Sequence, residues 1–594
     1  MTCLLLFAQS LAVSILLVAG AAIDNGDPDE QGLYSKADQV TILTNQNFDN
    51  HVYGQNHALL VQFYNSYCGH CRAFSPKFKT LAQDIRFWKN VIQLAVIDCS
   101  VFENGETCRN FEVTAYPSLR YMHPHYVKEN SNLGEPMRQA ETADKLKEVI
   151  VNKLISEQGI GNLRNVPPLN ILPYSSYEMA LRDVSEDVTN TFLVFENENS
   201  TMGPELILDT NDYLHIRVKR VLDISELAQK SGAKQFPTLV ALKNAVDIIP
   251  ITPKVVTRRN LLKAINNYLK SENYVFPDRQ GDTGDSPTDE HADNNISTAD
   301  TVFYSDLEKT IQTILHSEVP RYKTLTGEPL QAILNFLTIM IEIFPFRGNG
   351  REFFVELHDI LSKHQVWSGN DVADLITTLE SKHYPVYVSN LEYVACRGSQ
   401  AKYRGYSCGL WTLFHTLTVN AAQQPGTKGP QVLRAMHGYI KNFFGCTECS
   451  EHFQTMAAKN QIFDVKENDK AVLWLWVSHN EVNLRLAGDL TEDPYHPKIQ
   501  FPSPTKCPKC RQARGQWNLS AVYEYLQQIY GAANIQSQHS NAAQRGPSLF
   551  SNLDIGMLSL LYILSFAILI LVVKFLTKGF YRKRIHKHDG WGKV

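Results

Sequence analysis

The sequence predicts a multidomain protein with an α/β N-terminal half, an all-α C-terminal half and a single C-terminal transmembrane helix. Three observations lead to this fold class. Residues 35–155 alternate apolar strand patterns with amphipathic helical patterns, residues 302–535 keep a helical period, and residues 555–573 are uncharged and almost wholly apolar. At 594 residues the chain is too long for one core, and domains of about 100–200 residues predict three to five of them.

Composition and charge narrow the classes of function. Hydrophobic residues make up 44% and charged residues 20% of the chain, which is typical of globular protein. The net charge is −4, and basic residues gather near the C-terminus, so the rest of the chain is more acidic than this value indicates. A nucleic-acid partner requires clustered basic residues, and we therefore expect none.

Both ends of the chain carry targeting patterns. Residues 1–22 form an apolar run that ends in small residues, as a signal peptide does, although it lacks an N-terminal Lys or Arg; a buried helix is the alternative. Residues 555–573 are long enough to span a bilayer, with a core helix as the alternative. The basic tail at 574–594 is cytosolic by the positive-inside rule. These patterns predict a type I membrane protein with a lumenal or extracellular body.

Cysteine usage agrees with an oxidising compartment. Of the eleven cysteines, Cys3 leaves with the signal peptide and the other ten fall into five close pairs. Local pairs in even number are typical of disulfides in secreted proteins. Glycosylation sequons at Asn199, Asn295 and Asn518 give weak further support. The pairs are Cys68/Cys71, Cys99/Cys108, Cys396/Cys408, Cys446/Cys449 and Cys507/Cys510.

The first domain, 35–155, contains a CGHC motif at 68–71. A buried strand pattern at 58–64 leads into this motif, a helix pattern follows from about 72 to 86, and a second strand pattern covers 94–98. A Tyr-Pro turn then leads into another strand. This order of elements and motifs resembles the thioredoxin fold, close to the catalytic domains of protein disulfide isomerases.

Residues 166–272 look like a second copy of this domain that has lost its dithiol. The segment Phe-Pro-Thr-Leu at 236–239 repeats the pattern Tyr-Pro-Ser-Leu at 116–119. No cysteine lies between residues 109 and 395, so we interpret this thioredoxin-like domain as a redox-inactive spacer or binding surface.

The rest of the chain is organised around helices. A segment rich in Pro, Gly, Asp, Ser and Thr is predicted to be a flexible linker whose mobility could serve transfer between two redox centres. The helices that follow carry no chemical motif and are interpreted as structural, and the next helical domain carries the second dithiol. These segments are the linker 277–299, the helical region 302–395 with helices at 328–344 and 351–363, the domain 396–535, and a polar stalk at 536–552.

The CGHC motif predicts thiol–disulfide chemistry. In such a motif the first thiol, Cys68, attacks and the second, Cys71, resolves, and a helix N-terminus favours the thiolate. His70 can stabilise the Cys68 thiolate. Zinc is the alternative, but it needs two further ligands, and no second pair is local.

Two residues depart from the isomerase pattern. Tyr67 replaces the usual Trp, and Gln62 stands where the family often holds a buried acid. Both departures bear on the rate and the pH dependence of transfer. Pro117 matches the family's cis-proline, and Cys99/Cys108 is predicted to be a structural or regulatory disulfide.

The second dithiol, Cys446/Cys449, lies among aromatic, His and Asn residues at helical spacing. Residues three or four apart share one face of a helix, and such faces suit a planar ring rich in heteroatoms. Taken singly, each Trp is more often a core residue and each His a hydrogen-bonded polar residue. The spaced sets are Trp411 with His415, Glu448 and Cys449 with His452, and Trp476 with His479 and Asn483.

The runs 404–415, 443–449 with His452, and 476–483 resemble the small helical flavin-linked sulfhydryl oxidases of the Erv/ALR type. With the thioredoxin-like domains and the membrane span, residues 35–585 resemble the quiescin sulfhydryl oxidase family. This resemblance implies a helical-bundle domain that binds flavin adenine dinucleotide (FAD). The implied contacts are Arg404, Trp411, His415, Glu448, His452, Trp476, Val477, Ser478, His479, Asn480, Glu481, Val482, Asn483, Lys498 and Phe501, the last standing where some relatives carry Trp.

The resemblance also implies roles for the remaining cysteines. Cys449 would lie against the isoalloxazine ring and Cys446 would receive electrons from the thioredoxin pair. The pair Cys396/Cys408 would clamp the first helix of the oxidase domain, and Cys507/Cys510 would be a further disulfide. A zinc ribbon built from the pairs at 446/449 and 507/510 is disfavoured, because the intervening stretch exceeds the roughly 15–20 residues of such sites.

The resulting hypothesis is a thiol oxidase that catalyses 2 R–SH + O2 → R–S–S–R + H2O2 on secretory proteins, passing electrons from Cys68/Cys71 to Cys446/Cys449, FAD and oxygen. The alternatives are a disulfide isomerase without its own oxidant and a membrane-anchored scaffold. Neither explains the His-Asn-x-x-Asn run at 479–483. The chain ends without a KDEL-type signal, which favours the Golgi membrane or the cell surface. The sequence leaves open whether the ectodomain is shed.

Overall fold

The computed structural model describes residues 32–537 except 130–131, 165, 244–246, 278, 280–299 and 513–514, and also residues 570, 573 and 574. The expected signal peptide and the sequon at Asn295 lie outside the described residues, as do most of the linker, stalk, membrane span and basic tail. Across the residues that are described, no helix has both the length and the apolar character that a membrane crossing requires.

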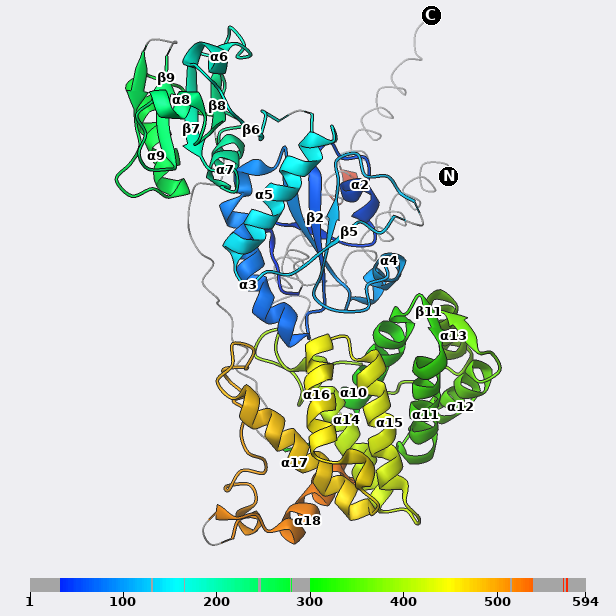
Figure 1. The fold of residues 1–594 in the computed structure, drawn as a ribbon. Helices are drawn as coiled ribbons and strands as arrows, with labels where there is room; N and C mark the ends of the chain where they lie inside the picture. The colour runs from blue at the N-terminus through cyan, green and yellow to red at the C-terminus, as the bar shows by residue number, and fades with distance from the viewer. Residues whose placement is uncertain are drawn as a thin grey trace, which may run out of the picture. The chain divides into compact units, whose positions relative to one another are not determined.

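A five-stranded sheet forms the first domain (Figure 1). Its strand order is β1-β3-β2-β4-β5, with β1, β2 and β3 parallel and β4 and β5 antiparallel to their neighbours. Every residue of β2 is buried, which explains its apolar sequence without alternation. The elements are β1 (Thr41–Leu43), α2 (Phe48–Val52), β2 (Ala58–Tyr64), α3 (Gly69–Asp84), η3 (Arg86–Trp88), β3 (Ile92–Asp98), η4 (Phe102–Asn104), α4 (Gly105–Asn110), β4 (Ser118–Met122), β5 (Glu135–Met137) and α5 (Ala143–Gly159).

Strand β2 has the bounds that its sequence predicts, whereas α3 begins at Gly69, three residues earlier than predicted. Cys68 keeps an extended backbone and stands at the N-cap position, so the rest of the CGHC motif forms the first helical turn. The apolar period that predicts a helix becomes visible only after the motif, and this is why the sequence places the start too late.

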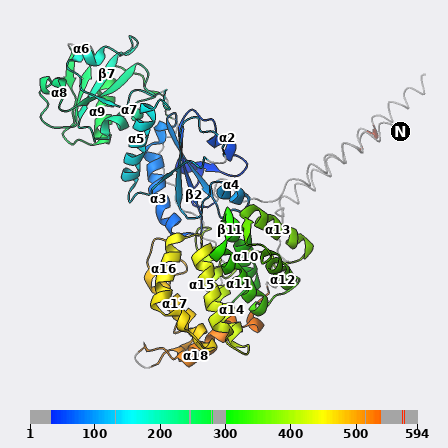
Figure 2. The ribbon, with the colours of Figure 1, turned by 45° about the vertical axis from the view of Figure 1, so that its right-hand side comes forward.

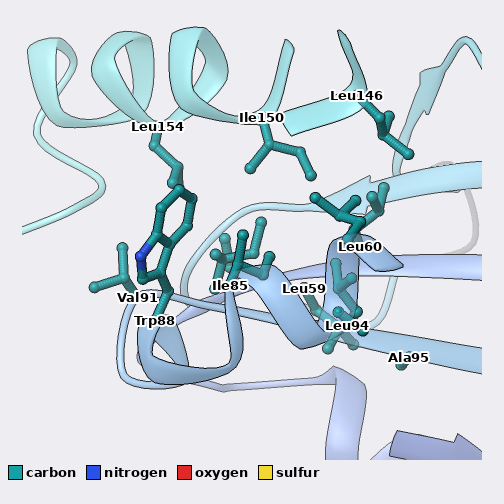
Figure 3. Packing of buried hydrophobic residues seen from close by; sticks show 14 of the residues in the cluster. Leu59, Leu60, Ile85, Trp88, Val91, Leu94, Ala95, Leu146, Ile150 and Leu154 are labelled. Atoms are coloured by element: carbon teal, nitrogen blue, oxygen red, sulfur yellow. The ribbon is translucent and has the colours of Figure 1, made fainter. Parts of the chain in front are cut away.

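The core of this domain lies between the sheet and the helix pair α3 and α5, which contact each other. Leu146, Ile150 and Leu154 recur every four residues along α5 and are buried, as an amphipathic helix requires. Figure 3 shows these side chains above Trp88 and the leucines of β2 and β3. Trp88 is fully buried and is among the largest side chains of this core.

A second five-stranded sheet repeats the first. Its order, β10-β9-β7-β8-β6, is the order of the first sheet when each strand is replaced by its counterpart, and the strand directions agree. This topology supports the interpretation of residues 166–272 as a second copy. The elements are β6 (Ile171–Leu172), α6 (Tyr177–Leu181), β7 (Asn190–Glu196), α7 (Met202–Asp209), β8 (Ile216–Leu222), α8 (Glu226–Lys230), β9 (Thr238–Leu242), β10 (Ile248–Pro250) and α9 (Arg258–Ser271).

Charged groups from the second sheet's helices anchor it to the first domain. The Arg258 guanidinium donates to Asp209 at 2.6 Å and to Asp84 at 2.5 Å, and the indole N–H of Trp88 donates to Asp209 at 2.8 Å. Asp209 is nearly inaccessible, and charge-assisted hydrogen bonds of this kind are the strong ones. The two thioredoxin-like domains are therefore joined by directional polar contacts.

Residues 302–535 are mainly helical, as the sequence predicts, and α14, α15, α16 and α17 pack side by side (Figures 1 and 2). The elements are α10 (Tyr304–Thr313), η5 (Ile314–Glu318), η6 (Val319–Arg321), β11 (Thr324–Thr326), α11 (Gly327–Ile343), α12 (Gly350–Leu361), β12 (Val366–Ser368), α13 (Gly369–Lys382), α14 (Gly405–Ala422), α15 (Lys428–Phe443), α16 (Thr447–Lys459), η7 (Ile462–Asp464), α17 (Asn468–Leu486), η8 (Pro508–Cys510), α18 (Leu519–Tyr530) and η10 (Ala532–Asn534).

The helical half departs from its sequence-based description in two ways. Strands β11 and β12 form a short antiparallel pair that the helical period does not reveal, because three-residue strands leave no periodic signal. One hydrophobic core also runs from the 302–395 region into the bundle around α14, so both share a single interior. Contacts join the sheets and the helices into one compact unit that ends at Ile535.

Candidate active site

The first dithiol lies at the N-terminus of α3 with both thiols buried and reduced. Burial raises the pKa of the Cys68 thiol, but hydrogen bonds from the Cys71 side chain and from the backbone N–H groups of Cys71 and His70 outweigh it, so the pKa falls below its ordinary value. Burial and the neighbouring Cys68 raise the pKa of Cys71. The first thiol is thus the one that ionises, and the second keeps its proton.

The Tyr116–Pro117 peptide beside Cys68 is cis. The Cys68 thiol lies 3.7 Å from the Tyr116 carbonyl oxygen, and the Asn65 N–H donates to the Cys71 sulfur at 3.4 Å. The sulfurs are therefore held from two sides, by the turn after β2 and by the loop before β4.

Gln62, the residue that stands in place of a buried acid, accepts a hydrogen bond from the Tyr34 hydroxyl at 2.6 Å and is fully buried. Asp98, a buried carboxyl at the end of β3, belongs to no motif in the sequence. Burial raises the pKa of Asp98, and its charge contributes to raising the pKa of Cys71. An acid thus acts on the second thiol from a different strand, and no local sequence signal reveals it.

The second dithiol repeats this geometry on α16. Cys446 stands at the N-cap with an extended backbone, and a disulfide joins it to Cys449 in the first turn. Cys446 is fully buried and belongs to the same apolar cluster as Cys68 and Cys71, while Cys449 is partly buried. A reduced pair and an oxidised pair therefore lie at the N-termini of two helices, α3 and α16, that contact each other.

Residues of the two motifs meet directly. The His70 imidazole contacts the Glu448 carboxylate through Nε2. The Tyr67 ring packs 4.6 Å from the Tyr406 ring and is stacked 6.2 Å from the Phe444 ring. Tyr67, which departs from the isomerase pattern, thus supplies an aromatic contact to the helical half, and the backbone N–H of His70, rather than its ring, lowers the pKa of Cys68.

Helices α14 and α17 bring an aromatic and histidine cluster together. The Trp411 and His479 rings are stacked at 4.2 Å with 3° between their planes, and His415 Nε2 lies 3.1 Å from His479 Nδ1. The Tyr530 ring, which the sequence analysis missed because α18 carries no motif, is stacked 4.8 Å from His415. Residues from three helices therefore create a set of stacking surfaces and ring nitrogens.

The loop after α17 is anchored to the inner face of that helix. The Trp476 indole N–H and the Asn480 amide both donate to the Phe501 carbonyl oxygen, at 2.6 and 2.7 Å. The Asn483 amide donates to the Ile499 carbonyl oxygen at 3.1 Å. In the structure, these three side chains hold the backbone that positions Lys498 and Phe501.

Cationic side chains and unsatisfied polar atoms gather around this cluster. Burial and then repulsion from Arg404 lower the pKa of Lys498, and the same two causes lower the pKa of His496. Arg404 Nε, His415 Nδ1, Ser478 Oγ and His496 Nε2 are buried without a hydrogen-bond partner in the described part of the chain. Buried polar groups are normally paired, so these atoms fit a polar, anionic, ring-containing cofactor.

The other residues that the sequence predicts as flavin contacts have different surroundings. Val477 is 47% exposed, and Glu481 pairs with Lys459 at 2.7 Å, so both point to another face of α17 than His479. Glu448 and His452 contact each other at 3.2 Å on α16. Val482 packs against the helical core.

The remaining cysteine pairs are closed as disulfides. Cys99–Cys108 joins the end of β3 to α4, and Cys396–Cys408 joins the preceding loop to α14. Cys507–Cys510 spans η8 from its N-cap to its last residue, within an apolar cluster that includes Trp476. The pairs at 446/449 and 507/510 belong to different apolar clusters.

Three family models match the chain. The Thioredoxin model matches residues 39–151, the FAD-dependent sulfhydryl oxidase model matches 298–399, and the Erv1/Alr family model matches 408–502. The fold class is thus confirmed for a thioredoxin-like α/β region followed by a helical Erv/ALR region.

Sulfhydryl oxidase 1 of Gallus gallus is 33% identical over 539 residues, which are 86% of this chain and 69% of its own. The chain belongs to the sulfhydryl oxidase family. Sulfhydryl oxidase 2 of Homo sapiens is 32% identical over 91% of this chain and 79% of its own. The solved "Sulfhydryl Oxidase Fragment of Human QSOX1" is 35% identical over 40% of this chain and 98% of its own, with a TM-score of 0.37, too low to argue for the fold.

As a sulfhydryl oxidase, the protein is a flavin-dependent enzyme that forms disulfide bonds in protein thiols, with oxygen as the electron acceptor and hydrogen peroxide as the product. This activity accounts for the oxidised and the reduced dithiol in one chain. An isomerase without its own oxidant and a scaffold account for neither the flavin-dependent oxidase match nor the cluster of α14 and α17.

We predict that acidification destabilises the helical half through His415. Burial lowers the pKa of His415 to about 3, so between pH 6.5 and 5 the unfolded chain takes up a proton that the folded chain does not. The free energy of unfolding should therefore decrease by about 1.4 kcal/mol for each unit by which the pH is lowered in this range. In urea denaturation at pH 7 and 5, His415→Gln should lessen the loss seen in the native chain. The exposed His51→Gln is the control, and an unchanged slope in H415Q would contradict the assignment.

We also predict that Cys99/Cys108 and Cys507/Cys510 serve stability alone, since neither pair belongs to the contact of α3 with α16 that joins the two motifs. Replacing either pair by serines should preserve most oxygen consumption and lower the free energy of unfolding by about 2–4 kcal/mol. Oxygen uptake and denaturation of the two double variants provide the measurement. A loss of turnover as large as that of Cys449→Ser would place that pair on the electron path.

Proposed function

We propose that electrons pass from substrate thiols through Cys68/Cys71 to Cys446/Cys449 and then to the flavin. The observation that carries this proposal is the meeting of the two motifs, with Cys446 in the same buried cluster as Cys68 and Cys71. Thiol–disulfide exchange occurs by attack of a thiolate on a disulfide sulfur, so a dithiol and a disulfide placed together are the reactants of one step.

In the first exchange, a substrate thiolate attacks the Cys68 sulfur of the oxidised pair, and Cys71 leaves as a thiolate. A second substrate thiolate attacks the substrate sulfur of this mixed disulfide, which forms the product disulfide and releases the Cys68 thiolate. The lowered pKa of Cys68 supports this role, because a thiol of low pKa is the better leaving group.

In the internal exchange, the Cys68 thiolate attacks the Cys446 sulfur, and Cys449 leaves as a thiolate. Cys71 then attacks Cys68, which restores the first disulfide and leaves Cys446 reduced. Two electrons and two protons have moved between the pairs, and the buried Asp98 carboxyl acts on Cys71, the thiol that must lose its proton last.

We propose FAD as the flavin. When bound, the flavin takes two electrons from the Cys446/Cys449 dithiol and passes them to oxygen, which yields hydrogen peroxide. The stacked rings of Trp411 and His479 suit its planar ring system, and the mutually repelling Arg404 and Lys498 suit the pyrophosphate of a dinucleotide. Trp476, Asn480 and Asn483 then act by holding the loop that carries Lys498 and Phe501.

We further propose that the protein works in the secretory pathway, as a type I membrane protein of the Golgi membrane or cell surface anchored by residues 555–573. Its oxidised structural cysteine pairs suit that compartment. Asn199 is exposed in the turn before α7 and can carry a glycan, and Asn518, at the N-cap of α18, is the second candidate. Reduced or unfolded secretory proteins are the substrates that this location offers.

The relay predicts that Cys68→Ser abolishes oxidation of protein thiols and leaves flavin bound. A small dithiol should still reduce Cys446/Cys449 directly, since it needs no thioredoxin motif. Cys449→Ser should stop oxygen consumption with every thiol. The checks are flavin absorbance and oxygen uptake with a reduced unfolded protein and with dithiothreitol. Normal turnover of the C449S variant would show that another pair donates to the flavin.

The membrane proposal predicts that a chain ending before Ile555 is secreted as a soluble enzyme with near-native oxygen uptake. The full chain should stay with membranes after alkaline extraction, because an apolar helix of this length inserts stably. Extraction and turnover of the two forms provide the measurement. A truncated form that binds flavin and fails to oxidise protein thiols would show that the anchor takes part in catalysis.

A further inference from the structure

A buried ion pair lies in the region to which the sequence analysis assigned no chemistry. Glu318 ends η5, Arg321 ends η6, and their side chains are 1% and 5% exposed. The guanidinium Nη1 lies 3.3 Å from the Glu318 carboxylate. Removing two charges from water costs several kcal/mol per ion, and well-packed apolar residues often stabilise a fold equally well. Stability alone is therefore a weak reason for this pair.

Glu318 holds the loop that carries the second dithiol. Its carboxylate accepts a hydrogen bond from the Gly445 N–H at 2.9 Å, and Gly445 directly precedes Cys446. Burial raises the pKa of Glu318 to about 7, although Arg321 and the Gly445 N–H both favour the charged form. The carboxylate thus depends on these two partners to remain ionised in the interior.

Arg321 reaches the loop before β4, which lies beside the first dithiol. Its guanidinium lies 5.9 Å from the centre of the Tyr116 ring, in cation–π range. Tyr116 is the residue whose carbonyl oxygen lies 3.7 Å from the Cys68 sulfur. The pair therefore contacts the loop before Cys446 and the Tyr116 loop beside Cys68. The contacts of His70 and Tyr67, by contrast, come from the first motif itself.

Gly445 shows how closely these groups approach. A Cβ at this position would lie 2.6 Å from Arg321 Nη1 and 3.0 Å from the Tyr116 ring. Real side chains do not reach such distances without displacing a neighbour, so a residue other than glycine would push the guanidinium or the ring away. The glycine lets the loop before Cys446, the ion pair and Tyr116 meet at one point.

We propose that Glu318 and Arg321 form a positioning pair that aligns Cys446 with Cys68 for the internal exchange; this inference rests on the proposed relay. The two residues form no bond to sulfur. They fix the backbone on either side of the step in which the Cys68 thiolate attacks Cys446 and Cys449 leaves. Misplacement of reacting atoms by about 1 Å can cost about 100-fold in rate, so alignment matters here.

The test compares two electron donors in the full-length flavin-loaded protein. Glu318→Ala should lower flavin reduction by a reduced unfolded protein by about 10- to 100-fold. Reduction by dithiothreitol, which bypasses Cys68, should change by less than about threefold. Glu318→Gln keeps an acceptor for the Gly445 N–H and should recover part of the rate. The matched control is Glu196→Gln, which neutralises another fully buried acid that pairs with Arg220, at 2.5 Å, in the second sheet; it should leave the ratio of the two rates unchanged.

Arg321→Lys provides a second test if the alanine variant loses its flavin. It keeps a charge beside Glu318 and removes the planar group that faces Tyr116, so the protein-driven rate should again fall more than the dithiothreitol rate. If the rates of flavin reduction by the two donors fell equally, or if E196Q changed the ratio of these rates as much, Glu318 and Arg321 would have only a structural role.

Parallel measurement of C68S separates the two hypotheses. If that variant still oxidises protein thiols at the native rate, the relay is wrong and the positioning pair with it. If C68S is inactive while E318A and R321K both transfer at the native rate, the relay stands and the positioning pair is overturned.

Discussion

Thiol–disulfide exchange requires the attacking and the attacked sulfur to touch, and this requirement governs the architecture of the chain. Cys68, Cys71 and Cys446 are all inaccessible to solvent in the described structure. Electrons therefore reach Cys446 from the thioredoxin-like domain only where one redox loop lies against the other. Each loop consists of an extended cysteine followed by the first turn of a helix, which presents the sulfur at the helix tip and lowers the cost of a thiolate there.

The contacts between the two redox loops differ in strength from those inside each half. The His70–Glu448 pair is more than one-third exposed on both sides, and such pairs contribute about 0–1 kcal/mol. The aromatic contact of Tyr67 adds about 0.5–1.5 kcal/mol beyond the area that it buries. By contrast, the buried Asp209 ties Arg258 to Trp88 between the two thioredoxin-like domains. Weak contacts suit a surface that must also accept protein substrates, whereas the stronger network keeps the two sheets together.

The candidate site in the helical half combines neutral histidine rings with positively charged side chains. Burial keeps His415 and His479 neutral, with the pKa of both held below the ordinary value, so they serve as hydrogen-bonding rings rather than as charges. Positive charge is supplied by Arg404 and Lys498, which repel each other, and the Lys498 charge contributes to lowering the pKa of His479. A neutral stacking region beside a cationic region is the arrangement that a flavin with phosphate groups requires.

Sequence motifs and the period of apolar residues alone predict much of the fold of this protein. The strand at 58–64, the CGHC motif, the repeat at 166–272 and the helical second half all follow from local patterns, because side-chain period and thiol spacing are properties of short segments. The same patterns predicted Trp411, His415 and His479 as members of one site, and the structure brings them into contact. They placed the start of α3 too late and passed over β11 and β12, since neither feature leaves a periodic signal.

Contacts over long sequence separation were decided only by the tertiary structure. Glu318 and Gly445 are 127 residues apart, Tyr67 meets Tyr406 across the linker, and Asp98 acts on Cys71 from another strand. No window of sequence contains both partners, and each partner by itself has an ordinary local environment. The sequence therefore determines which chemistry each half carries, while the packing of the helical half against the first domain determines which residues align the two sulfurs.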